Sequence, residues 1–161
     1  MKVAVLMGSN SDLPKIQKCI DTLKGLGIET VVRVMSAHRT PEVVAEFTEH
    51  AIENGFGVII AAAGGAAHLA GAVAAHTLLP VIGIPVEGGA FNGLDALLST
   101  VQMPGGIPVA TVGVGSGGAT NAALLAAEIL AANDPALREK LAAERAKRRE
   151  KVLEADAEIQ G

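Results

Sequence analysis

Residues 31–41 read VVRVMSAHRTP, and the predicted fold follows from the transition in this stretch. Its valine-rich first half is typical of a strand, while Thr40 suits the N-cap of a helix and Pro41 the first helical position. His38 and Arg39 should therefore lie in a turn between strand and helix, where α/β proteins bind ligands. Taken alone, the pattern is explained better by an ordinary surface turn that contains a histidine and an arginine.

The alternation of strand and helix continues on both sides of this stretch. Short apolar runs bounded by glycine or polar turns predict strands, and apolar residues at helical spacing predict helices between them. Five alternations indicate an α/β fold with a parallel sheet and helices on both faces. We expect a three-layer, doubly wound, flavodoxin-like catalytic domain over residues 1–132, with five strands in the order 2-1-3-4-5. The expected strands are 2–7, 28–35, 57–62, 81–86 and 109–114, and the expected helices are about 16–25, 41–53, 67–76, 92–101 and 119–132.

Length and composition limit the possible partners. The chain has 161 residues, enough for one domain with its own core, and its formal net charge of -4 argues against a general binder of nucleic acid or anionic membranes. Residues 54–86 contain no charged side chain, but Gly64-Gly65 and Pro80 interrupt this segment, so we expect a buried core and not a membrane span. The expected partner is a small molecule, with no nucleic acid and no membrane.

Cys19 is the only cysteine, which rules out an intrachain disulfide and fits a reducing compartment. It lies on the apolar stripe of the first expected helix, so we interpret it as a buried small hydrophobic residue. His50 belongs to a glutamate-rich helix face, and we expect it to be solvated. The chain does not open with a basic and then apolar leader, which predicts a cytoplasmic protein.

The expected helices 67–76 and 119–132 are apolar on nearly every side. A domain of this size cannot bury both alone, so we expect a homo-oligomer. Asn133-Asp134-Pro135 starts a further helix, and residues 133–161 form a charged helix that we expect to pack on a neighbouring subunit. Its basic residues at 145–151 are interleaved with glutamates, which favours a solvated or subunit-bridging helix over a nucleic-acid site.

Three unusual loops follow the first three expected strands. In the predicted strand order these strands are neighbours, so the loops open at one edge of the sheet around one crevice. The backbone N–H groups and hydroxyls of residues 8–11, together with Arg39, suit a phosphate monoester. The first loop lacks the patterns G-x-x-x-x-G-K-[ST] and G-x-G-x-x-G, so neither nucleotide triphosphates nor dinucleotides are indicated. The candidate residues are Gly8, Ser9, Ser11, Asp12, Ser36, His38, Arg39 and residues 64–69.

The imidazoles of His38 and His68 exchange protons near neutral pH, which favours acid–base catalysis in this crevice. A metal site formed by these histidines and Asp12 would need ligands from three separate loops, so we expect no metal. Helix capping is the alternative role of Ser11 and Asp12. The packing of a helix N-terminus is the alternative role of the two glycines at 64 and 65.

Three motifs, in this order, resemble those of the N5-carboxyaminoimidazole ribonucleotide mutase family (class I PurE). They are MGSNSD at residues 7–12, SAHRTP at 36–41 and GGAAHL at 64–69, and the short runs NGLD at 92–95 and QMP at 102–104 are similar too. The match runs from about residue 3 to residue 132. The resemblance implies an octameric isomerase of purine biosynthesis that needs no metal or organic cofactor. Such an enzyme moves a carboxylate from the exocyclic nitrogen of its ribonucleotide substrate to ring C4.

The resemblance also implies roles for individual residues. It assigns the substrate phosphate to Ser9, Ser36 and Arg39, the ribose to Asp12, and the aminoimidazole to Ala63, Gly64 and Leu69. His38 would transfer protons as general acid and base, and His68 would help to hold the carboxylate or carbon dioxide. Ala70 stands where the family usually has proline, which predicts a looser loop after His68.

Two other functions stay open. One is a related carboxylase that uses aminoimidazole ribonucleotide and free carbon dioxide, although the stretch GGAAHL argues for the mutase. The other is a non-catalytic nucleotide-phosphate-binding module, which needs an anion site but no reactive imidazole.

Overall fold

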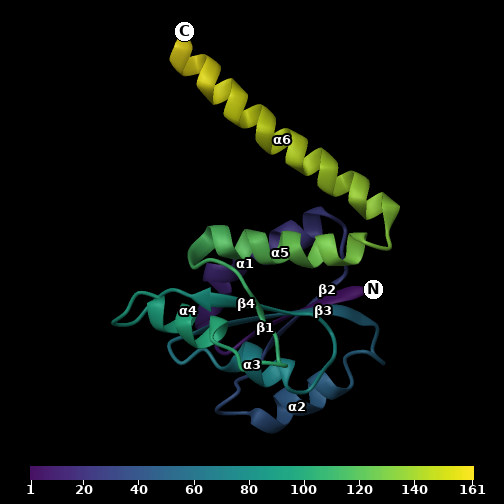
Figure 1. Cartoon of the computed structure of the whole chain (residues 1–161), viewed down its shortest axis with the longest axis vertical. Coiled ribbons are helices and arrows are strands. Elements are labelled where there is room, and N and C mark those ends of the chain that lie inside the picture. Colours follow the sequence, from purple (N-terminus) through teal and green to yellow (C-terminus); the bar gives the residue numbers. More distant parts are fainter.

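The computed structural model describes all 161 residues and contains the expected alternation of strands and helices, followed by one long helix (Figure 1). The strands are β1 Lys2–Met7, β2 Thr30–Val34, β3 Phe56–Gly64, β4 Val81–Val86 and β5 Ala110–Thr111. The helices are α1 Leu13–Gly25, α2 Pro41–Glu49, α3 Leu69–Ala74, α4 Leu94–Val101, α5 Gly115–Ala131 and α6 Pro135–Gln160, with a 3-10 turn, η1, at Asn10–Asp12.

The five strands form one parallel sheet in the order β2-β1-β3-β4-β5, which confirms the predicted flavodoxin-like topology. The central strands β1, β3 and β4 are buried because their apolar runs are covered on both faces, as is usual for parallel strands. The charge-free segment 54–86 therefore forms β3, α3 and β4. No helix of the chain is both long and apolar enough to cross a membrane.

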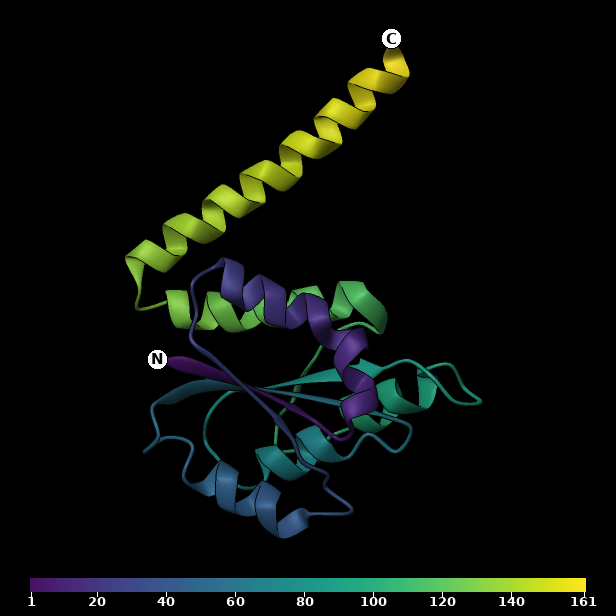
Figure 2. The same cartoon turned by 180° about the vertical axis from the view of Figure 1, so that it is seen from behind.

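Helices cover both faces of this sheet. α1 and α5 pack on one face around the larger hydrophobic core, whereas α2 and α3 pack on the other face around a smaller one (Figures 1 and 2). α4 lies on the same side as α3, over β4. A Cβ at Gly83 of β4 would collide with the side chain of Thr100, so a glycine is needed there for α4 to approach the sheet.

The strand β5 is shorter than the sequence predicts. The expected strand covers residues 109–114, but only Ala110 and Thr111 pair with β4. A Cβ at Gly118 would overlap the carbonyl group of Gly113, so the first turn of α5 packs directly on the chain that leaves the sheet. This close packing accompanies an early end of the strand, and α5 begins at residue 115 and not at 119.

The burial of α5 is largely achieved within one subunit. α5 packs on α1, on β3 and β4, and on the start of α6, and most of its alanines are buried. Leu124, Leu125 and Ile129 stay only partly buried, so one subunit covers most but not all of the apolar surface of this helix. The large apolar side chains that stay exposed include four in and just before α4, namely Phe91, Leu94, Leu98 and Val101.

The helix α6 leaves the body of the subunit as an arm (Figures 1 and 2). Its start agrees with the prediction, because Asp134 accepts a hydrogen bond from the backbone N–H of Leu137 at 3.0 Å and Pro135 occupies the first turn. Arg138 donates to two carbonyl groups at the end of α5, and Lys140 donates to the carbonyl of Leu26 after α1. Leu137 is the only buried residue of α6.

Candidate active site

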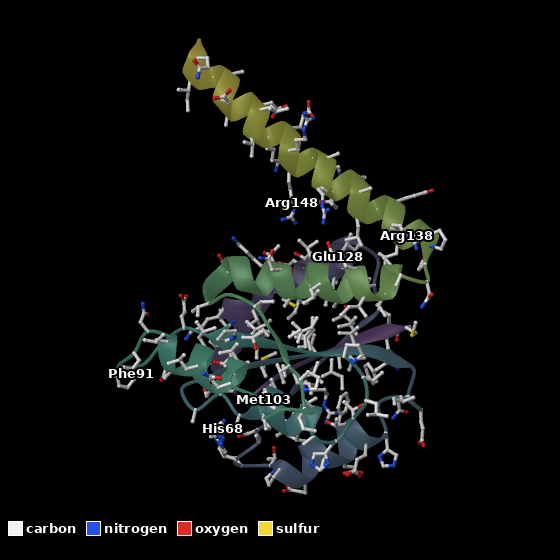
Figure 3. The ribbon with its side chains drawn as sticks, viewed as in Figure 1. His68, Phe91, Met103, Glu128, Arg138 and Arg148 are labelled. Atoms are coloured by element: carbon white, nitrogen blue, oxygen red, sulfur yellow. The ribbon has the colours of Figure 1, made fainter.

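The loops that follow β1, β2 and β3 meet at the carboxyl edge of the sheet around a cavity of about 350 Å³. Figure 3 shows that His68, which lines this cavity, lies on the opposite side of the sheet from α6. Most of the candidate residues border the same space. The lining residues are Gly8, Ser9, Asp12, Ser36, Ala37, His38, Arg39, Ala63, Gly64, Ala66, His68 and Leu69.

Two imidazoles meet in the cavity. Nε2 of His38 lies 2.8 Å from Nδ1 of His68, and the two rings are nearly perpendicular, at 86°. His38 is exposed in the turn before α2, and His68 is exposed at the residue before α3. One of the two nitrogens donates and the other accepts, so a single proton occupies this contact.

The guanidinium of Arg39 is fixed beside the histidines by two neighbouring loops. Its Nη2 donates to the carbonyl of Gly8 at 2.6 Å, and its Nε lies 3.4 Å from the hydroxyl of Ser36. The same hydroxyl accepts a hydrogen bond from the backbone N–H of Arg39 at 3.2 Å. These contacts use only part of the five N–H donors of an arginine, so others stay available to an anion.

Thr40 occupies the N-cap position of α2 and Pro41 the first helical position, as the sequence predicts. The Thr40 side chain, however, does not cap the helix. Its Oγ1 accepts a hydrogen bond from the backbone N–H of Ser36 at 2.9 Å. The hydroxyl therefore closes the turn that contains His38 and Arg39, because a bond across that turn takes the place of the bond to the helix.

The first loop differs in two details from the expectation. Ser11 does not line the cavity, and its hydroxyl donates to Oγ of Ser9 at 2.9 Å. The N–H of Gly8 is not open to an anion, because it donates to the carbonyl of Ala62 at 3.2 Å. Capping of η1 is performed by Ser9, whose Oγ accepts from the N–H of Ser11 at 3.3 Å.

Asp12 lines the cavity at the N-cap position of α1, but its side chain makes no capping hydrogen bond. Burial raises the pKa of this carboxyl above its ordinary value, against the opposing effects of the Lys15 charge, a hydrogen bond from the backbone of Ser9, and the Arg39 charge. The carboxyl can therefore accept hydrogen bonds from a ligand, because it does not cap the helix.

The third loop brings backbone close to the cavity. A Cβ at Gly64 would lie 3.3 Å from the carbonyl oxygen of Val86, and Gly65 has a φ of +60°, so both positions favour glycine. Ala63 and Leu69 flank this turn and line the cavity. Ala70, the residue that departs from the family pattern, is buried in the first turn of α3.

Two residues at or near the site were not among the sequence candidates. Ala37 lines the cavity beside His38, but a methyl group offers no chemical signal of its own. Ser99, on α4, contacts the turn after β3 through its hydroxyl. A serine within a helix gives no sequence signal for such a contact, because the contact joins segments 32 residues apart.

Other titratable groups lie away from the cavity. Cys19, on the buried face of α1, belongs to the core, and burial raises the pKa of its thiol to about 12, in line with the structural interpretation. His50 is exposed at the end of α2, where the carbonyl of Glu46 and nearby glutamates raise its pKa. No group of three or more His, Cys, Asp or Glu side chains is arranged to hold a metal ion.

The fold and the site together define a flavodoxin-like α/β protein with an imidazole pair and a guanidinium at the carboxyl edge of its sheet. Comparison with known families matches residues 2–151 to the family described as AIR carboxylase. The chain belongs to this family.

Individual relatives agree with this assignment. The chain is 51% identical over 157 residues to a Bacillus subtilis protein named N5-carboxyaminoimidazole ribonucleotide mutase, covering 98% of this chain and 97% of the relative. A Pyrococcus abyssi protein of the same name is 55% identical over 140 residues, which covers 87% and 79% of the two chains. The crystal structure of Treponema denticola PurE superposes with a TM-score of 0.88 at 32% identity and covers 99% of this chain and 98% of that chain.

Proposed function

We propose that the chain is an isomerase of purine biosynthesis that converts N5-carboxyaminoimidazole ribonucleotide into 4-carboxy-5-aminoimidazole ribonucleotide. The relatives that carry the mutase name, at about 50% identity over nearly the whole chain, support this activity. The observation that supports the chemistry is the 2.8 Å contact between His38 and His68 in a cavity bordered by Arg39. This arrangement joins a proton-transfer group to an anion-binding group.

The proposed reaction is a decarboxylation followed by a recarboxylation. His38 donates a proton to the carbamate nitrogen, and the N–C bond breaks to release carbon dioxide. Ring C4 then attacks that carbon dioxide, and His38 removes the proton from C4. One imidazole serves both steps, because the proton that it takes from C4 restores the form that began the reaction.

His68 is proposed to hold the migrating group. When its Nδ1 carries the shared proton, it donates toward His38 in the free protein and toward the carboxylate once substrate is bound. His38, released from this contact, takes up from solvent the proton that it gives to the carbamate nitrogen. Substrate binding thus replaces one acceptor with another at the same nitrogen. Retention of carbon dioxide between the two steps requires the cavity to exclude water.

The phosphate is proposed to bind between Ser9, Ser36 and Arg39. The contacts of the guanidinium with the Gly8 carbonyl and with Ser36 hold it in place before the ligand arrives, which reduces the entropy cost of binding. A charged donor to phosphate also gives a stronger hydrogen bond than a neutral one. Ser11 contributes through the position of Ser9, since its own hydroxyl is bonded there.

The rest of the ribonucleotide is proposed to lie deeper in the cavity. Asp12 accepts hydrogen bonds from the ribose hydroxyls, because its carboxylate is not engaged as a helix cap. The flat aminoimidazole lies against Ala63, Gly64 and Leu69, where the glycine lets the ring approach the backbone. No metal and no organic cofactor takes part in this proposal.

A closed homo-oligomer, as large as an octamer, is proposed for the working enzyme in the cytoplasm. The exposed apolar side chains in and before α4 are a surface that another copy would cover. The distal part of α6 is proposed to pack on a neighbouring subunit. It extends beyond the body of its own subunit, which buries only Leu137 of this helix (Figure 1). The catalytic body is then residues 1–132, and the arm is residues 133–161.

A direct carboxylase is the second candidate, and the family description AIR carboxylase is the observation that favours it. The test supplies the purified protein either with N5-carboxyaminoimidazole ribonucleotide, or with aminoimidazole ribonucleotide plus bicarbonate at physiological concentration. Formation of the C4-carboxylated product is followed in both. We expect efficient turnover only with the first substrate, whereas efficient turnover with the second identifies a carboxylase. Binding of phosphorylated ligand without turnover of either substrate would identify a non-catalytic module.

A further inference from the structure

The turn between β3 and α3 carries His68. The hydrogen bonds within this turn do not satisfy all of its backbone groups. Gly65 in this turn has a left-handed φ of +60°, and the N–H of His68 bonds the carbonyl of Ala66 at 2.8 Å. Ala67, directly before His68, is 1% exposed, so its backbone N–H needs a partner within the protein. The partner comes from another element.

That partner is the hydroxyl of Ser99 on α4. The N–H of Ala67 donates to Oγ of Ser99 at 3.0 Å. The same Oγ lies 2.6 Å from the carbonyl of Asp95 and 3.3 Å from the carbonyl of Gly65. A hydroxyl has one proton, and the shortest contact directs it to Asp95, which leaves the oxygen lone pairs turned to Ala67.

We propose that Ser99 is a positioning residue for the acid–base pair: its hydroxyl fixes the turn 64–68 so that His68 presents Nδ1 to His38. The inference rests on the proposed function for its kinetic consequence, but not for its geometry. Ala67 is adjacent to His68, and loss of its hydrogen bond frees the backbone on which the imidazole is mounted. The buried N–H would then draw the turn toward another acceptor or toward water.

The neighbouring residue in α4 offers a matched control. Thr100 makes the same kind of bond along the helix, from Oγ1 to the carbonyl of Ala96 at 2.7 Å, but its side chain makes no hydrogen bond to the turn. Thr100→Val removes this bond at nearly constant shape. Ser99→Ala removes the bond along the helix and the bond to the turn together, so the difference between the variants isolates the turn.

The experiment compares wild type, Ser99→Ala, Ser99→Thr and Thr100→Val. For Ser99→Ala we expect kcat to fall by between about 10-fold and 100-fold, the range for a reacting group displaced by about 1 Å, with KM little changed. The imidazole nitrogen NMR signals of His38 and His68 in the ligand-free protein should shift as their contact lengthens. Ser99→Thr keeps the hydroxyl and should restore most of both readouts, and Thr100→Val should leave both near wild type.

Unchanged kcat and unchanged imidazole signals in Ser99→Ala would overturn the proposal, as would an equal loss in Thr100→Val. If Ser99→Ala does not fold, Ser99→Cys keeps the volume but accepts hydrogen bonds weakly, and the same shifts are expected of it. If wild type fails to turn over the ribonucleotide, the proposed function is wrong, while the NMR readout in the ligand-free protein still decides the role of Ser99.

Discussion

The crevice and the α6 arm lie on opposite sides of the sheet and are built in different ways. In the crevice, exposed polar groups are held by contacts between segments far apart in sequence, such as that between His38 and His68. In α6, the contacts beyond the first turns are exposed ion pairs, namely Arg145 with Glu128 at 2.9 Å and Lys147 with Glu144 at 3.1 Å. Exposed pairs of this kind contribute little stability.

The difference indicates where single substitutions should matter. A crevice residue has both a partner in another loop and a role toward the ligand, so its replacement changes the geometry and the chemistry together. A residue in the distal part of α6 has neither within its own subunit. We therefore expect large functional effects in the crevice, and effects on assembly alone from the end of the arm.

The largest effect is expected from His38→Asn. Asparagine keeps some hydrogen bonding but cannot carry a proton between two steps, so kcat should fall by about 10²–10⁴-fold while nucleotide binding is largely kept. Steady-state kinetics and titration with a substrate analogue measure the two quantities. His50→Asn, at an exposed histidine outside the cavity, should keep normal kcat. Near-normal turnover of His38→Asn would remove His38 from the proposed role.

A smaller effect is expected from Arg39→Ala. Loss of a charged hydrogen bond should weaken binding of the phosphorylated ligand by about 1.5–3 kcal/mol, with little loss for the dephosphorylated nucleoside. Calorimetric titration with both ligands measures the difference. Arg33→Ala is the matched control, because Arg33, on β2, lies over the ring of Phe47 of α2 and does not line the cavity. An equal loss for both ligands would show that Arg39 does not bind the phosphate.

The fold could be predicted well from the sequence, because apolar periodicity and turn residues act locally. The parallel sheet followed from the alternation of elements, its strand order from the flavodoxin-like topology, and the start of α6 from Asp134 and Pro135. The short β5 could not be predicted, because the end of that strand is set by the packing of Gly118 of α5 on Gly113. The cover that α1 and α6 give to α5 could not be predicted for a similar reason, since it depends on contacts between distant segments of the folded subunit.

The candidate site was predictable to the level of its loops. Motifs and strand order bring most of the chosen residues to one cavity, because the carboxyl ends of neighbouring parallel strands share an edge. The orientation of individual groups was not predictable. Ser11 turns to Ser9, and the N–H of Gly8 is used by Ala62, because each depends on a partner whose position only the folded chain defines. Ser99 lacks a sequence signal for the same reason.

Removal of the distal arm tests the other side of the comparison. A chain that ends at Arg149 keeps Arg138, Lys140 and Arg145, the residues of α6 that bond to α1 and α5. Its circular dichroism should differ only by the lost helix, whereas light scattering should report a smaller particle than the closed oligomer of the full chain. An unchanged number of subunits in the particle would show that the distal arm does not hold subunits together.

The smallest effect is expected from Asp12→Asn, on stability. Burial raises the pKa of Asp12 above 3.8 in the folded chain, so ionisation of this carboxyl destabilises the fold once the pH passes its unfolded value. The variant should be slightly more stable than wild type at pH 7, and this gain should vanish below about pH 3.8, where Asp12 is protonated in both states. Denaturant unfolding at both pH values measures it.

The matched control for this prediction comes from the arm. Asp156→Asn, on the exposed part of α6, should change the free energy of unfolding by less than about 0.5 kcal/mol at either pH. A destabilised Asp12→Asn protein at pH 7 would show that the ionised carboxylate supports the fold and is not held under strain for ligand binding.

The central claim is that the carboxylate is transferred within the cavity, without exchange with the medium, by the proton transfers of His38. It is tested most directly by giving the enzyme substrate with a labelled carboxylate in unlabelled bicarbonate buffer, and by measuring the label in the C4-carboxylated product at early times. The account predicts that nearly all product keeps the label, because carbon dioxide released in the cavity meets C4 at high effective concentration. Label diluted to the level of the medium bicarbonate would contradict transfer inside a closed site and would favour the direct carboxylase.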